Sequence, residues 1–209
     1  MVRDLVEKAL FFRDGTRTFF EPEEFPWVAE IEAEWKTIRK ELDALMVRRE
    51  EIPNFQDLSK SQAALTEGDQ WKTFFFYLFG NKYKENCLRC PETVRLLKKI
   101  PGMRTGMFSI LAPGKHIPAH RGPYKGVLRL HLGLMIPPPE GGCRIRVGND
   151  VRAWREGKSL IFDDSNEHEV WNDCDAHRVV LFVDFVRPTI FPLSLVNLAI
   201  IWLRGRYPL

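Results

Sequence analysis

Two histidines and one arginine, far apart in the sequence, have the side-chain chemistry of a metal site with an acidic co-substrate. His120 lies in HIPAHRGPYKG, His168 lies in FDDSNEHEVW, and Arg178 follows ten residues after His168. Imidazole is a good ligand for Fe(II), and a guanidinium group can bind a carboxylate through two parallel hydrogen bonds. These side chains are the parts of a non-haem iron site that uses an α-keto acid.

The position that usually supplies the third iron ligand carries no acid. Non-haem iron triads of two histidines and one carboxylate are often written H-x-D…H, and the residue two positions after His120 is Gly122. The spacing alone therefore leaves a second interpretation open, in which His120 is a loop residue and His168 is a hydrogen-bonded core histidine.

From about residue 101 to residue 188 the sequence predicts short strands that could position these side chains. The segments FSILA, GVLRLHLGLMI, CRIRV and RVVLFVDFV are rich in β-branched and aromatic residues and are bounded by Gly, Pro, Asn or Asp. In VLRLHLGLM the apolar residues alternate with Arg129 and His131, so these two side chains share one face of a strand. About eight strands at this spacing predict an antiparallel jelly roll or closed barrel.

The part before residue 101 has mainly helical periodicity. Apolar residues recur at spacings of three and four, which predicts an amphipathic helix packed on the outside of the barrel: Val28, Ile31, Trp35, Ile38, Leu42 and Leu45. Residues 52–70 are polar and turn-rich and are expected to form a loop, and residues 71–79 are expected to form a buried strand. The 209 residues fit one domain, with a helical part over about 1–100, a strand core over about 101–188 and an apolar helix over about 189–209.

The overall composition is that of a globular protein without a nucleic-acid partner. Hydrophobic residues make up 44% and charged residues 28%, and 31 basic against 28 acidic residues give a net charge of only +3. Four cysteines are too few for a disulfide scaffold, so the CxxC of Cys87 and Cys90 is expected to hold structural thiols. The first residues are too charged for a secretory signal, which favours the cytoplasm.

The segment from Phe191 to Arg206 is apolar on nearly every side before it ends in Arg204 and Arg206. One interpretation is a helix that docks on the barrel or on a second copy of the chain. The other is an interfacial anchor, which would give peripheral membrane contact and membrane association at the C-terminus. The sequence leaves the oligomeric state open.

Three segments carry a resemblance to a known family: SILAPGKHIPAHRGPYKGVLRLHLGL, EGKSLIFDDSNEHEVWND and RVVLFVDFVRP. They resemble the aspartyl/asparaginyl β-hydroxylases, a family that also includes bacterial lipid A hydroxylases. The resemblance covers about residues 53–190 and is dense from 107 to 187. It implies a double-stranded β-helix with N-terminal helices outside, and a dioxygenase that uses Fe(II), 2-oxoglutarate and O2.

The resemblance also implies roles for individual residues of the metal site. His120 and His168 match the two iron ligands. Gly122 matches a glycine of the aspartyl branch, in which water replaces the carboxylate ligand. Asp164 matches a catalytic acid that could hydrogen-bond this water.

A second group of residues matches the co-substrate and substrate contacts. Arg178 and Ser109 match the residues that hold the distal carboxylate of 2-oxoglutarate. His131 and Arg129 match residues near its keto-acid end, and Arg129 also matches a substrate contact. Val127 departs from the pattern, because the aspartyl hydroxylases carry at this position an arginine that binds the substrate carboxylate.

The expected function is therefore hydroxylation of an aspartyl or asparaginyl residue, or of a related amino-acid or peptide substrate. The valine at position 127 keeps an alternative open, a lipid A-type hydroxylase of acyl chains at the membrane surface. A third possibility is a non-catalytic barrel that only binds a ligand, although such a protein would have no need for an arginine at position 178.

Overall fold

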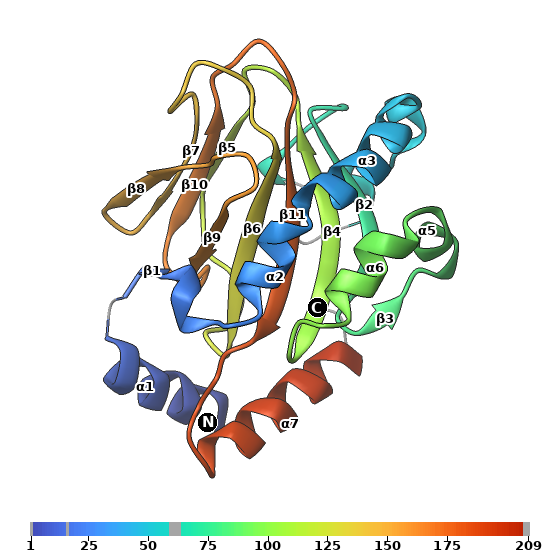
Figure 1. Cartoon of the computed structure of the whole chain (residues 1–209). Coiled ribbons are helices and arrows are strands. Elements are labelled where there is room, and N and C mark those ends of the chain that lie inside the picture. The colour runs from blue at the N-terminus through green and yellow to red at the C-terminus, as the bar shows by residue number, and fades with distance from the viewer. Residues whose placement is uncertain (1, 16, 59–63, 207–209) are drawn as a thin grey trace.

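The computed structural model describes residues 2–15, 17–58 and 64–206 (Figure 1). Two antiparallel sheets form the centre of the molecule and helices pack around them, which confirms the predicted mainly-β jelly-roll class. The larger sheet has the order β1-β9-β6-β11-β4-β2-β3, and the smaller sheet has the order β5-β10-β7-β8.

The first four strands belong to the larger sheet, and from β4 onward the chain passes back and forth between the two sheets. The seven strands of the larger sheet are β1 (Phe19–Phe20), β2 (Trp71–Leu78), β3 (Asn81–Lys82), β4 (Met103–Leu111), β6 (Val127–Met135), β9 (Ser159–Phe162) and β11 (Arg178–Val186). The smaller sheet consists of β5 (His116–His120), β7 (Cys143–Val147), β8 (Asp150–Ala153) and β10 (His168–Asn172). Each sheet therefore combines segments that are distant in sequence, as a double-stranded β-helix requires.

Helices cover the outer face of the larger sheet and one end of the molecule (Figure 1). They are α1 (Val2–Asp14), α2 (Val28–Ala33), α3 (Trp35–Met46), α4 (Phe55–Leu58), α5 (Lys84–Arg89), α6 (Pro91–Leu97) and α7 (Leu193–Arg206), with short 3-10 turns at Pro22–Glu24 and Arg49–Glu51. The helical layer is held together partly by Glu41 of α3, whose carboxylate accepts hydrogen bonds from the backbone of Glu92 and Thr93 in the first turn of α6. In the described part of the chain, no helix is both long and apolar enough to cross a membrane.

The side chains of β6 show how the core is divided. Leu128, Leu130 and Leu132 point outward and pack in a core with the helices, whereas Arg129 and His131 point between the two sheets. The same alternation in β4 and β11 turns Ser109 and Arg178 into this inner space. The shared face that the sequence predicts for Arg129 and His131 is therefore the inner face of the barrel.

Several element boundaries differ from the sequence prediction. The single helix expected over residues 28–45 is broken at Glu34, whose backbone angles (φ −96°, ψ 10°) leave the α region. The loop expected over residues 52–70 contains the short helix α4. The part expected to be helical also holds strands β1 and β3, because β1 pairs with the distant strand β9 and β3 forms a hairpin with β2. The C-terminal helix begins at Leu193, and residues 207–209 lie outside the described residues.

Candidate active site

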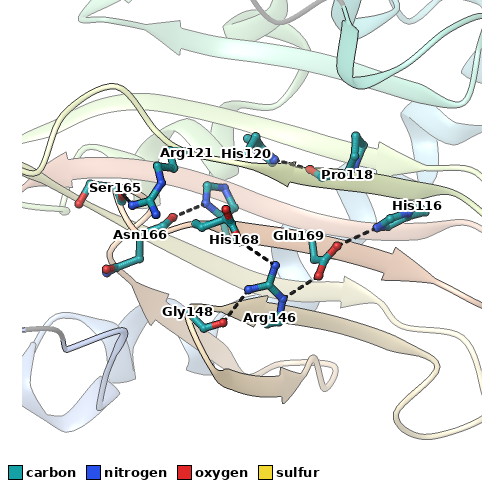
Figure 2. A network of polar contacts seen from close by, with 11 residues as sticks. His116, Pro118, His120, Arg121, Arg146, Gly148, Ser165, Asn166, His168 and Glu169 are labelled. Atoms are coloured by element: carbon teal, nitrogen blue, oxygen red, sulfur yellow. Dashed lines mark hydrogen bonds and ion pairs between the residues drawn. The ribbon is translucent and has the colours of Figure 1, made fainter.

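The two candidate iron ligands lie next to each other on neighbouring strands of the smaller sheet. His120 ends β5, His168 begins β10, and the two residues are direct partners in the antiparallel ladder. Their ring centroids are 4.1 Å apart with the ring planes tilted by 52°, and Figure 2 shows both rings on adjacent strands. The strand register thus brings together two imidazoles that are 48 positions apart in the sequence.

Hydrogen bonds fix the same nitrogen in both rings. Nδ1 of His120 lies 2.8 Å from the carbonyl oxygen of Pro118, and Nδ1 of His168 lies 3.0 Å from that of Asn166 (Figure 2). A carbonyl can only accept, so each Nδ1 carries the proton and each Nε2 keeps a free lone pair. Burial lowers the pKa of both imidazoles, to about 3 for His168, which keeps them neutral and able to bind a metal.

The carboxylate of Asp164 fills the space next to Gly122. The Gly122 N–H donates a 2.7 Å hydrogen bond to the Asp164 carbonyl, and a Cβ atom at position 122 would lie only 1.9 Å from Asp164 Oδ2. Gly122 is therefore required by close packing. In the described part of the chain, no group of three or more His, Cys, Asp and Glu side chains could hold a metal ion.

We expect Gly122→Asp to lower the free energy of unfolding by about 2 kcal/mol, because the new side chain collides with a buried carboxylate and adds a second charge beside it. Urea unfolding of the variant measures this loss. The double variant Gly122→Asp/Asp164→Ala removes the collision and should recover part of the stability. A Gly122→Asp variant as stable as the wild type would show that Asp164 does not occupy this space.

Arg129 links the buried carboxylate of Asp164 to the partly buried carboxylate of Asp184 at the edge of the pocket. Its guanidinium donates to both carboxylate oxygens of Asp184, at 2.8 and 3.2 Å, and lies 2.9 Å from Asp164 Oδ2. Burial raises the pKa of Asp164 to about 6, although the nearby Arg129 acts against this shift. Arg129 also lies over the ring of Phe182, 4.1 Å from its centroid. The arginine expected to contact co-substrate and substrate is thus already held by this chain's own acids while it lines the pocket.

Arg178 carries a buried charge in the pocket. Its side chain is 1% exposed, and within the described residues neither Nε nor Nη1 has a hydrogen-bond partner. The guanidinium lies 4.4 Å from the ring centroid of Trp154, and burial lowers its pKa to about 10. A buried guanidinium without a carboxylate costs free energy, and an anion in the pocket would offset this cost.

Ser109 lies near this guanidinium. Leu111 is the β4 partner of Arg178, and Ser109 is two residues before Leu111 on the same face of the strand. Its Oγ accepts a 3.0 Å hydrogen bond from Trp71 Nε1. The hydroxyl hydrogen of Ser109 therefore points away from Trp71. Ser109 and Trp71 line the same pocket as Arg178.

His131 lies between the histidine pair and Arg178 in the pocket wall. It is 5% exposed, and neither ring nitrogen has a partner among the described residues. Burial and the neighbouring Arg178 lower its pKa well below the usual value, so the ring is neutral. Three aromatic rings surround it, with centroids 5.0 to 5.7 Å away: Trp154, Phe162 and Phe182.

The structure thus brings most of the sequence-predicted site into one pocket and adds residues that the sequence analysis missed. The pocket is lined by Trp71, Ser109, Ile117, His120, Arg129, His131, Ile145, Phe162, His168, Val170, Arg178 and Phe182. Asp184 was missed, although a single carboxylate in the apolar strand RVVLFVDFV was a signal for a buried ion pair. Trp154, which stacks on Arg178, gave no such signal.

Other candidate residues lie away from this pocket. Val127 packs in a separate apolar cluster with α1 and α7. His116 is exposed, stacks on Trp171 and lies 3.3 Å from a Glu169 carboxylate oxygen (Figure 2). Cys87 and Cys90 are buried free thiols whose pKa values are raised by burial, as expected for structural cysteines.

Comparisons with known proteins extend these observations. Residues 32–188 match the family described as aspartyl/asparaginyl beta-hydroxylase. An ornithine lipid ester-linked acyl 2-hydroxylase from Rhizobium tropici is 52% identical over 186 residues, which cover 89% of this chain and 66% of the relative. The human aspartyl/asparaginyl beta-hydroxylase is 39% identical over 170 residues, 79% of this chain and 22% of the human protein.

Among solved structures, the cupin domain of Cnp3 from Schizosaccharomyces pombe matches with a TM-score of 0.39 and 9% identity, over 60% of this chain and 71% of that domain. The family match covers most of the chain, and the relatives named by their activity are hydroxylases. The chain therefore belongs to the aspartyl/asparaginyl β-hydroxylase family.

Proposed function

We propose that this protein is a hydroxylase that uses Fe(II), 2-oxoglutarate and O2. The observation that supports this most directly is the buried guanidinium of Arg178, whose Nε and Nη1 lack hydrogen-bond partners among the described residues, in the same pocket as two neutral imidazoles with free Nε2 atoms. A metal cation and a dicarboxylate together would satisfy both features. A barrel that only bound an apolar ligand would have no use for a buried unpaired charge, which argues against a non-catalytic role.

The pocket residues fit these groups chemically. His120 and His168 would hold the iron through Nε2, and Arg178 with the Ser109 hydroxyl would bind the distal carboxylate of 2-oxoglutarate. When bound, iron and 2-oxoglutarate supply the oxidising chemistry that places one oxygen atom of O2 on a C–H bond.

The other pocket residues orient these groups and exclude water. The Asp164 carboxylate beside Gly122 is placed to orient a water near the metal, and Arg129 holds this carboxylate in place. The rings of Phe162, Phe182 and Trp154 around His131 exclude bulk water from the inner end of the pocket.

We favour an acyl chain of a membrane lipid over a peptidyl aspartate as the substrate. The relative that acts on an ester-linked acyl group of ornithine lipid is 52% identical to this chain, whereas the human relative that acts on aspartyl and asparaginyl groups is 39% identical. Val127 supports the same choice. An apolar side chain packed against α1 and α7 cannot bind a substrate carboxylate, as the arginine at this position does in the aspartyl hydroxylases that the sequence resembles.

The test is turnover by the purified protein with Fe(II) and ascorbate. We expect succinate release from 2-oxoglutarate to rise when ornithine lipid is added, and mass spectrometry to find lipid with one added oxygen atom on an acyl chain. A peptide substrate of the aspartyl hydroxylases serves as the matched comparison. Hydroxylation of the peptide and not of the lipid would overturn the substrate class, and no succinate with any substrate would overturn the enzyme.

A further inference from the structure

The helix α7 buries the polar side chain of Asn197 and exposes several apolar side chains. Asn197 is fully buried, whereas residues 195, 196, 198, 202 and 203 of the same helix are exposed and apolar. A surface helix normally turns polar side chains to solvent. The helix α7 packs Leu193, Ile200 and Ile201 inward beside Asn197 and leaves apolar side chains on its outer surface as well. We define the α7 apolar face by the exposed residues Ile190, Phe191, Leu195, Val196, Leu198, Trp202 and Leu203.

The orientation of α7 is fixed by hydrogen bonds. Asn197 Oδ1 accepts a 2.8 Å hydrogen bond from the Tyr124 hydroxyl, and Asn197 Nδ2 donates a 2.9 Å hydrogen bond to the carbonyl of Gly126. Ile201 packs beside Tyr124 in the cluster that α7 shares with α1. Rotating the helix to bury its apolar face would break these bonds and expose Ile201, so the outward apolar face belongs to the native arrangement.

Hydrogen bonds also connect α7 to the loops that flank the candidate metal ligands. Tyr124 and Gly126 lie in the loop between His120 and Val127, and Lys125 of this loop donates a 2.6 Å hydrogen bond to the buried carboxylate of Asp163. Asp163 precedes Asp164 in the segment that leads to His168. The loops beside both histidines are therefore anchored at the end of the molecule that α1 and α7 cover (Figure 1).

We propose that the α7 apolar face docks on the surface of a bilayer that contains anionic lipids. This inference rests on the proposed lipid substrate and names the surface through which the protein reaches it. Exposed Trp202 is of the residue type that favours the boundary between acyl chains and headgroups. From Thr189 to Leu209 the sequence has two arginines, Arg204 and Arg206, and no acidic residue, which complements anionic headgroups.

Co-sedimentation with lipid vesicles tests this proposal without metal or co-substrate. We expect the wild type to bind vesicles of phosphatidylcholine with phosphatidylglycerol more strongly than vesicles of phosphatidylcholine alone. Leu195→Glu/Leu198→Glu should weaken the binding by about tenfold or more, since two apolar side chains no longer enter the acyl layer. Leu88→Glu/Val151→Glu is the matched control, because both positions are exposed and apolar but lie on α5 and β8, and it should bind like the wild type.

Two results would overturn the docking proposal. One is equal binding of Leu195→Glu/Leu198→Glu and the wild type. The other is a wild type that does not bind vesicles and sediments as a dimer that the same substitutions dissociate, which would show that a second copy covers the face. These results differ from a failure of the proposed function. A protein that binds vesicles through α7 but releases no succinate would support the docking surface and contradict only the proposed hydroxylase activity.

Discussion

His120→Ala and His168→Ala are each expected to abolish turnover and to lower Fe(II) affinity by more than about a hundredfold. Losing a group that merely orients a metal ligand typically costs 10- to 100-fold, and these changes remove one of two protein ligands outright. Isothermal titration with Fe(II) under anaerobic conditions measures the affinity, and succinate release measures the turnover.

His116→Ala is the matched control for the histidine variants. His116 lies on the same strand as His120, but it is exposed and pairs with Glu169 away from the pocket (Figure 2). We expect this variant to bind Fe(II) like the wild type. Retention of wild-type iron affinity by either His120→Ala or His168→Ala would place the metal elsewhere.

Arg178→Met should lower the affinity for 2-oxoglutarate by about a hundredfold while Fe(II) affinity is kept. A charge-assisted pair of hydrogen bonds to a carboxylate contributes a few kcal/mol, and a thioether cannot replace it. The substitution should leave the ligand-free protein at least as stable as the wild type, because it removes a buried guanidinium whose Nε and Nη1 lack partners among the described residues. Thermal unfolding with and without 2-oxoglutarate reports both effects, since a bound ligand stabilises the folded protein by RT ln(1 + [L]/Kd) and so raises Tm less when its affinity is lower.

The control for this experiment is Arg144→Met, which removes an arginine of β7 that is partly exposed and pairs with Asp173 outside the pocket. We expect 2-oxoglutarate to raise the Tm of this variant as it does for the wild type. Equal stabilisation of Arg178→Met and the wild type by 2-oxoglutarate would mean that another group binds the distal carboxylate.

Periodicity in the sequence was sufficient to predict the inner face of the barrel. The alternation of apolar residues with Arg129 and His131 predicts one shared face, and the structure turns that face toward the pocket. The resemblance to a known family supplied what spacing could not, since two histidines without an acid at Gly122 left a core role open. The fold class was predicted correctly because strand propensity and turn residues agree along residues 101–188.

Contacts that depend on strand register were beyond sequence reasoning. The pairing of Arg129 with Asp184 follows from their direct opposition in β6 and β11, and the approach of Asp164 to Gly122 follows from the packing of two loops. Neither contact is local in sequence. Likewise the outward apolar face of α7 becomes visible only once Asn197 is seen to accept a hydrogen bond from Tyr124, because periodicity cannot say which face of a nearly uniform apolar helix turns inward.

The central claim is a metal site made by two histidines, with Arg178 holding the far end of the co-substrate. The most direct measurement is a crystal structure of the protein with Mn(II) in place of Fe(II) and with 2-oxoglutarate. We expect the metal on Nε2 of both His120 and His168, the distal carboxylate of 2-oxoglutarate on the Arg178 guanidinium, and no carboxylate of the chain bound to the metal. An Asp or Glu oxygen at a ligand distance of about 2.0–2.2 Å from the metal, or 2-oxoglutarate bound away from Arg178, would contradict the account.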